Sequence, residues 1–304
     1  MSTLEITQSI IAPIFIVVGI AALVDRIFDI EPQGISRLVV YLFTPFLVFE
    51  GLAYSELDAG EAGQIILVAF GTQMITAFVA WRIARLAGFD RRLESAFILV
   101  ATLINAGNYG IPLNRFAFGA EGEARALLFF VETILVTNTL GVFLASRGSV
   151  STTKALRNVL SVPLPYAAAL GLIVNLTNFE LPDAIDKSTA LIADAAIPGM
   201  LVVLGIRLRR TSIREYSGRL KPLLMAGGLR MVFAPLVALG IVTVLGISGL
   251  TRQVSLVQAA MPTAVISGVL ATEFGGDADF VTAAIFVNTL ASIGTLSILL
   301  SLVM

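Results

Sequence analysis

The chain of 304 residues is 57% hydrophobic and 13% charged, whereas charged residues make up about 25% of an ordinary soluble domain. This composition indicates a polytopic membrane protein, and a formal net charge of −1 argues against nucleic acid as a partner. With neither cysteine nor histidine, the chain has no disulfide, no thiol nucleophile and no imidazole to act as general base or zinc ligand.

Apolar segments of roughly 20 residues, the length that crosses a bilayer as a helix, recur along the chain. We expect ten such spans, joined by connections too short to hold a soluble domain. They cover residues 6–24, 35–53, 62–83, 93–119, 124–146, 159–176, 188–206, 222–245, 250–274 and 280–303. The first follows no lysine or arginine, so it lacks the basic region of a signal peptide and is expected to remain as a span.

The fourth segment contains a stretch that does not suit an unbroken helix. Two glycines, two asparagines and a proline fall within eight positions, Asn105-Ala106-Gly107-Asn108-Tyr109-Gly110-Ile111-Pro112. Proline removes a backbone donor and glycine weakens a helix. In hydrocarbon an unpaired peptide group costs several kcal/mol, so a break persists only where protein or a water-filled cavity satisfies it. The stretch therefore predicts a binding site at membrane depth.

Lysine and arginine are distributed unevenly over the expected loops. The first, third, fifth and seventh loops hold 15 of them, and the opposite side holds Arg115, Arg125, Lys187 and Arg252. By the positive-inside rule the richer loops are cytoplasmic. We therefore expect a protein of the cell membrane with both termini outside the cytoplasm, which agrees with an even number of spans.

Landmarks of the first half recur in the second. Three pairs are 150 residues apart: Pro112 and Pro262, Asn138-Thr139-Leu140 and Asn288-Thr289-Leu290, and Pro13 and Pro163. Two other pairs have a different spacing: 153 residues between Pro45 and Pro198, and 156 between Phe118-Gly119 and Phe274-Gly275. Chance alignment of prolines is the alternative to a duplication. Five spans per half would insert the second copy upside down, which predicts inverted repeats at residues 1–150 and 151–304. Such repeats with paired broken helices are typical of secondary transporters.

The sequence resembles the auxin efflux carrier (AEC/PIN-like) family. The resemblance rests on the Asn105 to Pro112 stretch, Thr139-Leu140-Gly141-Val142-Phe143-Leu144, Ala196-Ile197-Pro198, Met261-Pro262-Thr263-Ala264 and Glu273-Phe274-Gly275-Gly276-Asp277. That family includes plant PIN-type auxin exporters and bacterial carriers for malonate or malate, and it is related to the bile-acid sodium symporters. The resemblance implies an all-α fold of ten transmembrane helices, in which spans 4 and 9 are broken and cross near Pro112 and Pro262.

The resemblance also implies two spatial units and an elevator movement between them. The scaffold would comprise about residues 1–60 and 151–215, and the transport domain about residues 61–150 and 216–304. Members dimerise through the scaffold, so a homodimer is expected. The chain lacks the long cytoplasmic loop of plant exporters, and nothing in the sequence singles out auxin as substrate.

Both breaks point to an anion as substrate. Pro112 and Pro262 suit the first turn of a new half-helix, where the missing N–H is unpaired anyway. Two half-helix N-termini, each with about +0.5 charge, would balance one carboxylate. We expect alternating-access transport of a small organic anion, a carboxylate or an auxin-like molecule. The candidate binding residues are Asn105, Asn108, Tyr109, Gly110, Pro112, Asn138, Pro262, Thr263, Ser267 and Asn288.

Each candidate side chain has a structural alternative. Asn105 and Asn108 either contact substrate or cap the broken helix, and Asn138 and Asn288 either contact substrate or join helices. Tyr109 either stacks on an aromatic substrate or fills the core. The second break has no asparagine, so its polar contacts must come from Thr263, Ser267 or the backbone. The first break is therefore expected to provide most side-chain recognition.

Four charged residues fall inside expected spans: Glu50, Glu132, Asp194 and Arg230. Burying each near the bilayer centre costs about 2.5–3.5 kcal/mol on the lenient insertion scale. Acids that alternate between charged and neutral forms would couple proton movement to transport. The alternatives are positions near an interface, or pairing with Arg230. Two other options remain open. Sodium could be the coupling ion, with oxygen ligands from Asn, Thr and broken-helix carbonyls, or the protein could be a uniporter driven by membrane potential.

Other function classes have weaker support. A sodium-coupled symporter of the bile-acid type is the first alternative, and a channel is the second because crossed half-helices also line pores. An intramembrane protease is disfavoured because Asp277, in Gly275-Gly276-Asp277, falls in a short loop without a partner aspartate in a matching span. We expect no enzyme, no cofactor, no metal and no nucleic acid, with the lipid bilayer and a small anion as partners.

Overall fold

The computed structural model describes residues 2–145, 161–211 and 220–304, and every regular element in these ranges is helical. Seven of the described helical stretches are long and apolar enough to cross a membrane. They are Thr3–Phe28, Pro32–Ala53, Ala59–Leu86, Ala106–Ala145, Asp183–Arg209, Leu220–Val244 and Ala278–Val303. The expectation of an all-α polytopic membrane protein is confirmed. Five lysines and arginines of the expected cytoplasmic loops lie outside the described ranges: Arg147, Lys154, Arg157, Arg214 and Arg219.

Several of these stretches contain one π-helical turn. In chain order the first elements are α1 (Thr3–Ile6), η1 (Thr7–Ile11), α2 (Ala12–Phe28), α3 (Pro32–Leu38), η2 (Val39–Phe43) and α4 (Thr44–Ala53). A proline occupies the second position of the α-helix that follows η1 and η2, at Pro13 and Pro45. A proline ring clashes with the carbonyl four residues earlier, and the wider π turn gives it room.

The remaining elements follow short turns. They are α5 (Ala59–Leu86), α6 (Arg91–Thr102), η3 (Ala106–Gly110), α7 (Ile111–Val136), η4 (Thr137–Gly141), α8 (Val142–Ala145), α10 (Leu164–Thr177), α11 (Asp183–Asp194), α12 (Ala196–Arg209), α13 (Leu220–Gly228), η5 (Leu229–Phe233), α14 (Ala234–Val244), α15 (Gly249–Ala259), α16 (Ile266–Glu273) and α17 (Ala278–Val303). Gly119, with a φ of 69°, interrupts α7. The carboxylate of Asp277 accepts from the N–H of Phe280 at 3.0 Å, so this aspartate caps α17.

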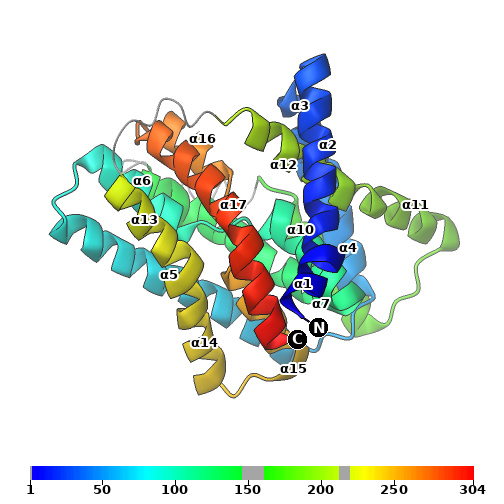
Figure 1. Ribbon diagram of the computed structural model, residues 1–304. Coiled ribbons are helices and arrows are strands. Elements are labelled where there is room, and N and C mark those ends of the chain that lie inside the picture. The colour runs from blue at the N-terminus through cyan, green and yellow to red at the C-terminus, as the bar shows by residue number, and fades with distance from the viewer. Residues whose placement is uncertain (1, 146–160, 212–219) are drawn as a thin grey trace.

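The helices form two groups (Figure 1). In one, α2 packs on α12 and α4 packs on α10 and α11; in the other, α5 packs on α6 and α14, and α13 packs on α6. Asp25 of α2 is fully buried and accepts from Arg209 at 2.5 Å and Arg210 at 2.7 Å, which ties α2 to the end of α12. Both termini lie on one face, where Thr7 and Ser297 share a hydrogen bond of 2.7 Å between their hydroxyl groups.

Candidate functional site

Two helix breaks meet inside the molecule. Residues 103–105 separate α6 from η3, and residues 260–265 separate α15 from α16. The breaks pair as a short antiparallel bridge between Ile104 and Thr263. The N–H of Asn105 donates to the Pro262 carbonyl at 2.8 Å, and the N–H of Ala264 donates to the Leu103 carbonyl at 2.9 Å. Each break thus satisfies peptide groups of the other, as a break at membrane depth requires. We call this pairing the crossing.

The two prolines do not occupy equivalent positions. Pro262 lies in the extended part of the second break, four residues before α16, and not in the first turn of a helix. Pro112 is the second residue of α7 after a π turn, and Pro13, Pro45 and Pro235 hold the same position in other helices. The expectation that the helices cross at Pro112 is wrong, because the crossing is at Ile104 and Thr263.

A cavity of about 450 Å³ borders the crossing, and we call it the crossing cavity. Its walls come from both breaks and from η2, α7, η4 and α12. They are largely apolar, with these polar residues: Ser36, Asn105, Asn108, Thr133, Thr137, Asn138, Arg207 and Glu273. An apolar lining with few polar groups is typical of small-molecule sites. Gly107 and Asn108 of η3 and Ile266, the first residue of α16, lie in the wall, and the first N–H groups of a helix have no intrahelical acceptor.

Three predicted binding residues line the crossing cavity: Asn105, Asn108 and Asn138. Asn105 is 5% exposed, and its side-chain Nδ2 has no hydrogen-bond acceptor among the described residues. The side chain of Asn138 donates to the Ile134 carbonyl at 2.9 Å. An unpaired buried donor costs free energy, so Asn105 is a candidate donor to a bound acceptor.

The other predicted side chains lie behind the crossing. Asn288 donates to the Thr263 hydroxyl at 2.9 Å, and Thr263 donates to the Val100 carbonyl at 2.9 Å. Tyr109 is fully buried and contacts Phe15 edge to face, with ring centroids 5.7 Å apart. Ser267 is also fully buried, with no hydrogen-bond partner for its hydroxyl among the described residues. None of these four residues lines the cavity, and Asn288 and Thr263 join the second break to α6.

Gly110, another predicted residue, does not line the cavity either, and its small size permits a close helix contact. A Cβ at this position would collide with the side-chain amide of Gln258, which is fully buried. That amide donates to the carbonyl of Ala106 at 3.4 Å and to that of Ala126 at 3.3 Å. Glycine at 110 therefore lets α15 approach the start of α7 closely.

Arg207 is a cavity residue that the sequence did not single out. It lies in the last turns of α12, lines the crossing cavity and donates to the Ser36 hydroxyl at 3.3 Å. Its Nε has no acceptor among the described residues. From sequence it counted only as one of the basic loop residues. Its position at the end of an apolar helix gave no signal that it faces the breaks.

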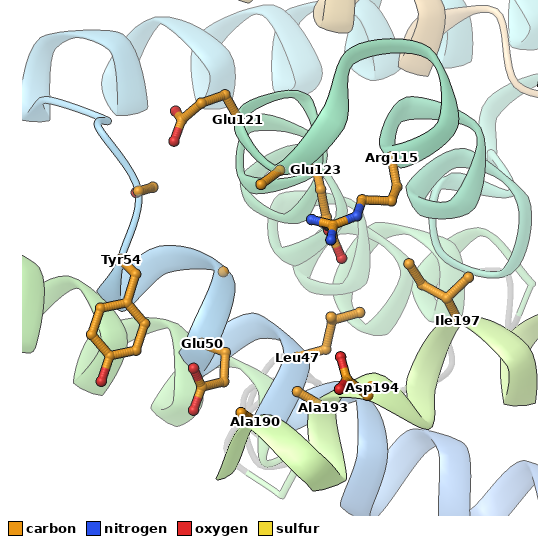
Figure 2. Close-up of a pocket in the computed structure, with 13 residues that line it drawn as sticks. Leu47, Glu50, Tyr54, Arg115, Glu121, Glu123, Ala190, Ala193, Asp194 and Ile197 are labelled. Carbon is orange, nitrogen blue, oxygen red and sulfur yellow. Dashed lines mark hydrogen bonds and ion pairs between the residues drawn. The ribbon is translucent and has the colours of Figure 1, made fainter. Parts of the chain in front are cut away.

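A second cavity, of about 370 Å³, contains two of the predicted coupling acids (Figure 2). Glu50 and Asp194 line it from α4 and α11, and Arg115 lines it from α7 beside Glu123, to which it donates at 2.8 Å. Glu50 also accepts from the Thr189 hydroxyl. At the rim, the hydroxyl of Tyr54 donates to Asp186, and this bond raises the pKa of Tyr54 to about 12.

The other two predicted coupling residues lie apart from both cavities. Glu132 is 4% exposed and accepts from the Gln73 amide at 2.5 Å. Arg230 is fully buried and donates to the carbonyls of Ala101 and Thr102, both at 3.2 Å, and to that of Ala259. Among the described residues none of the three acids pairs with Arg230, so that alternative is wrong.

Comparison with known proteins agrees with this architecture. A family model described as "Membrane transport protein" matches residues 8–300. The chain belongs to this family. An uncharacterized transporter of Methanothermobacter thermautotrophicus is 28% identical over 268 residues, which cover 88% of this chain and 87% of the relative. A putative malonate transporter of Rhizobium meliloti is 23% identical over 317 residues, 98% of this chain and 96% of the relative.

Plant relatives match half of this membrane transport protein. Auxin efflux carrier component 1 of Arabidopsis thaliana is 25% identical over 141 residues, which cover 45% of this chain and 22% of the plant protein. The resemblance to the auxin efflux carrier family is thus confirmed. A transporter family implies a small-molecule substrate and a multi-pass membrane location.

Proposed function

We propose that this protein is a secondary active transporter that carries a small organic anion across the cell membrane by alternating access. The crossing cavity is the observation that supports this best. Two half-helix N-termini reach its wall, and at about +0.5 charge each they balance one carboxylate. The unpaired amide of Asn105 supplies a donor for the same group.

Charge and shape suggest which anions fit. Arg207 adds a full positive charge to the lining of the crossing cavity, and Glu273 adds a negative one. A dicarboxylate such as malonate would place one carboxylate at the crossing and the other at Arg207. An aromatic carboxylate would place its ring against the apolar wall, where Tyr41 and Phe130 lie. We propose carboxylates as the substrate class and malonate as the first to test, since a relative is named for it.

The position of the two cavities supports an inward-facing state. The crossing cavity reaches Ser36, Arg207 and Glu273, at helix ends next to the loops that the positive-inside rule assigns to the cytoplasm. The second cavity reaches Tyr54 and Arg115, at the opposite ends. In this proposal both termini lie outside the cytoplasm and the substrate enters or leaves the crossing cavity on the cytoplasmic side.

Left-handed helix ends support the proposed inverted repeat of ten spans. Of the seven described residues with positive φ, all but Gly249 form three pairs: Asp29 with Asn178, at 47° and 49°; Gly88 with Gly246, at 67° and 66°; and Gly119 with Gly275, at 69° and 70°. The pairs are 149, 158 and 156 residues apart, so the second copy contains insertions. On this basis we retain the scaffold of residues 1–60 and 151–215, the moving domain of residues 61–150 and 216–304, and dimerisation through the scaffold as proposals.

Proton coupling is the favoured coupling mode in this proposal. Glu50 and Asp194 share the second cavity between the two helix groups, where movement of α7 would change their surroundings. Glu132 is buried with one unpaired carboxylate oxygen, Oε1, among the described residues. Uptake that follows a sodium gradient and ignores a pH gradient would contradict this part of the proposal.

Thermal stability of the purified protein tests the site. Malonate, malate and indole-3-acetate are screened against the wild type, Asn105→Ala and Asn108→Ala, with Gln33→Ala as an exposed amide control. A ligand that binds only the folded state raises the melting temperature. We expect the best carboxylate to stabilise the wild type and Gln33→Ala, and to stabilise both asparagine variants less. Undiminished stabilisation of both asparagine variants would remove these residues from the site.

A further inference from the structure

Arg230 is the largest fully buried side chain among the described residues. It lies in η5, and its guanidinium donates to three carbonyls: those of Ala101 and Thr102 at the end of α6, and that of Ala259 at the end of α15. These two helices are the halves that end at the crossing. One side chain from a third segment therefore joins both helix ends from behind.

Electrostatics explains why a cation is stable there. The last carbonyls of a helix have no intrahelical donor, and each helix C-terminus carries about −0.5 charge. Two such ends converge on one guanidinium, so their sum offsets its single positive charge. A buried charge without compensation would be strongly destabilising. Here the compensation comes from helix ends and not from a carboxylate.

We infer that Arg230 is a built-in counter-cation, which fills the position where the C-termini of α6 and α15 would otherwise need a bound metal ion. Carbonyls of this kind, at half-helix C-termini and unwound backbone, coordinate sodium in transporters with broken helices. Because an arginine does not lose its proton in proteins, Arg230 is a permanent positioning residue and not a coupling group. Its consequence for transport rests on the proposed function: in a carrier of this kind the crossing binds no sodium.

Thermal unfolding in detergent tests the inference without any substrate. Arg230→Ala removes the cation and leaves a space of its size, and Arg252→Ala, an exposed arginine of α15, is the matched control. We expect Arg230→Ala to lower the melting temperature by at least about 5 °C. Millimolar guanidinium chloride should recover part of this loss in Arg230→Ala alone, and should not stabilise the wild type or the control.

Two further variants keep the test informative if Arg230→Ala does not fold. Arg230→Lys retains a positive charge, and Arg230→Gln retains amide donors without the charge. A counter-cation predicts that the lysine variant is the more stable of the two. It also predicts that replacing sodium by choline leaves the wild-type melting temperature unchanged.

Three results would overturn the inference. The first is a glutamine variant as stable as the lysine variant. The second is an Arg230→Ala protein that guanidinium does not stabilise. The third is a wild-type protein that melts at a higher temperature in sodium than in choline. None of these measurements involves a substrate anion. Failure of the proposed transport function would therefore leave them unchanged, and the two failures can be told apart.

Discussion

Replacing Gly171 with alanine tests how closely α10 packs on α4. A Cβ at position 171 would lie 2.7 Å from the carbonyl oxygen of Phe49 and 3.1 Å from the Cβ of Leu52. Both atoms are fixed to the backbone of α4, so neither can rotate away. One turn further along α10, the Asn175 amide donates to the carbonyls of Ala53 at 3.3 Å and Ser55 at 2.6 Å. A displaced α10 would stretch both bonds.

The expected free-energy change has two opposing parts. In an unobstructed helix, alanine in place of glycine stabilises by about 0.5–1 kcal/mol. Forcing an additional methyl group into a packed contact costs about 1–3 kcal/mol. Since the obstructing atoms are rigid and the Asn175 bonds weaken as well, we expect Gly171→Ala to destabilise by about 1–2 kcal/mol. Gly19→Ala in α2, with no heavy atom within 4 Å of the new Cβ, should stabilise slightly.

Thermal unfolding of the two variants in one detergent measures this contrast. We expect Gly171→Ala to melt a few degrees below the wild type, since about 1 kcal/mol corresponds to roughly 2–4 °C in a chain of a few hundred residues. Gly19→Ala should melt at or above the wild-type temperature. If Gly171→Ala is stabilised as much as Gly19→Ala, the close contact between α10 and α4 is not present and the packing argument is refuted.

Three further predictions concern transport and topology. Arg207→Gln should weaken the affinity for dicarboxylates by about tenfold or more, because a hydrogen bond to a charged group contributes about 1.5–3 kcal/mol; equal Michaelis constants in proteoliposomes would contradict this. Glu132→Gln should abolish the response of uptake to a pH gradient, and an unchanged response would remove this acid from coupling. The chain has no cysteine, so Gly34→Cys and Met304→Cys introduce the only thiol. An impermeant maleimide should label Met304→Cys on intact cells and Gly34→Cys only after permeabilisation, and the reverse pattern would invert the topology.

The fold class could be predicted from sequence because bilayer thickness sets both the length and the apolarity of a spanning helix. The first break could also be located, since glycines and asparagines crowd around residue 107. The residues that pair at the crossing could be located only in part: the sequence predicted Pro112 and Pro262, and the bridge joins Ile104 to Thr263, which is next to Pro262 but lies eight residues before Pro112 on the first side. Proline has two roles in this fold: Pro262 lies in an extended break, whereas Pro112 follows a π turn inside a helical stretch. Residue type alone does not separate these roles.

Side-chain roles depended on contacts between distant segments. Asn138 and Asn288 each begin an Asn-Thr-Leu tripeptide, yet Asn138 lines the crossing cavity and Asn288 is buried behind Thr263. From the sequence, Arg207 is one of several basic loop residues. Arg230 is a charged residue inside an apolar span with no partner that the sequence identifies. Their roles follow from the approach of α12 and η5 to the breaks, which no local pattern records.

Counterflow of labelled malonate in proteoliposomes tests the central claim most directly, with indole-3-acetate as the second anion. The account predicts saturable uptake that unlabelled substrate on the opposite side accelerates, in the wild type and in Gln33→Ala. It predicts a much lower rate in Asn105→Ala, because that variant lacks the unpaired donor at the crossing. Flux that does not saturate, or an Asn105→Ala protein that transports as well as the wild type, would contradict an anion carrier with its site at the crossing.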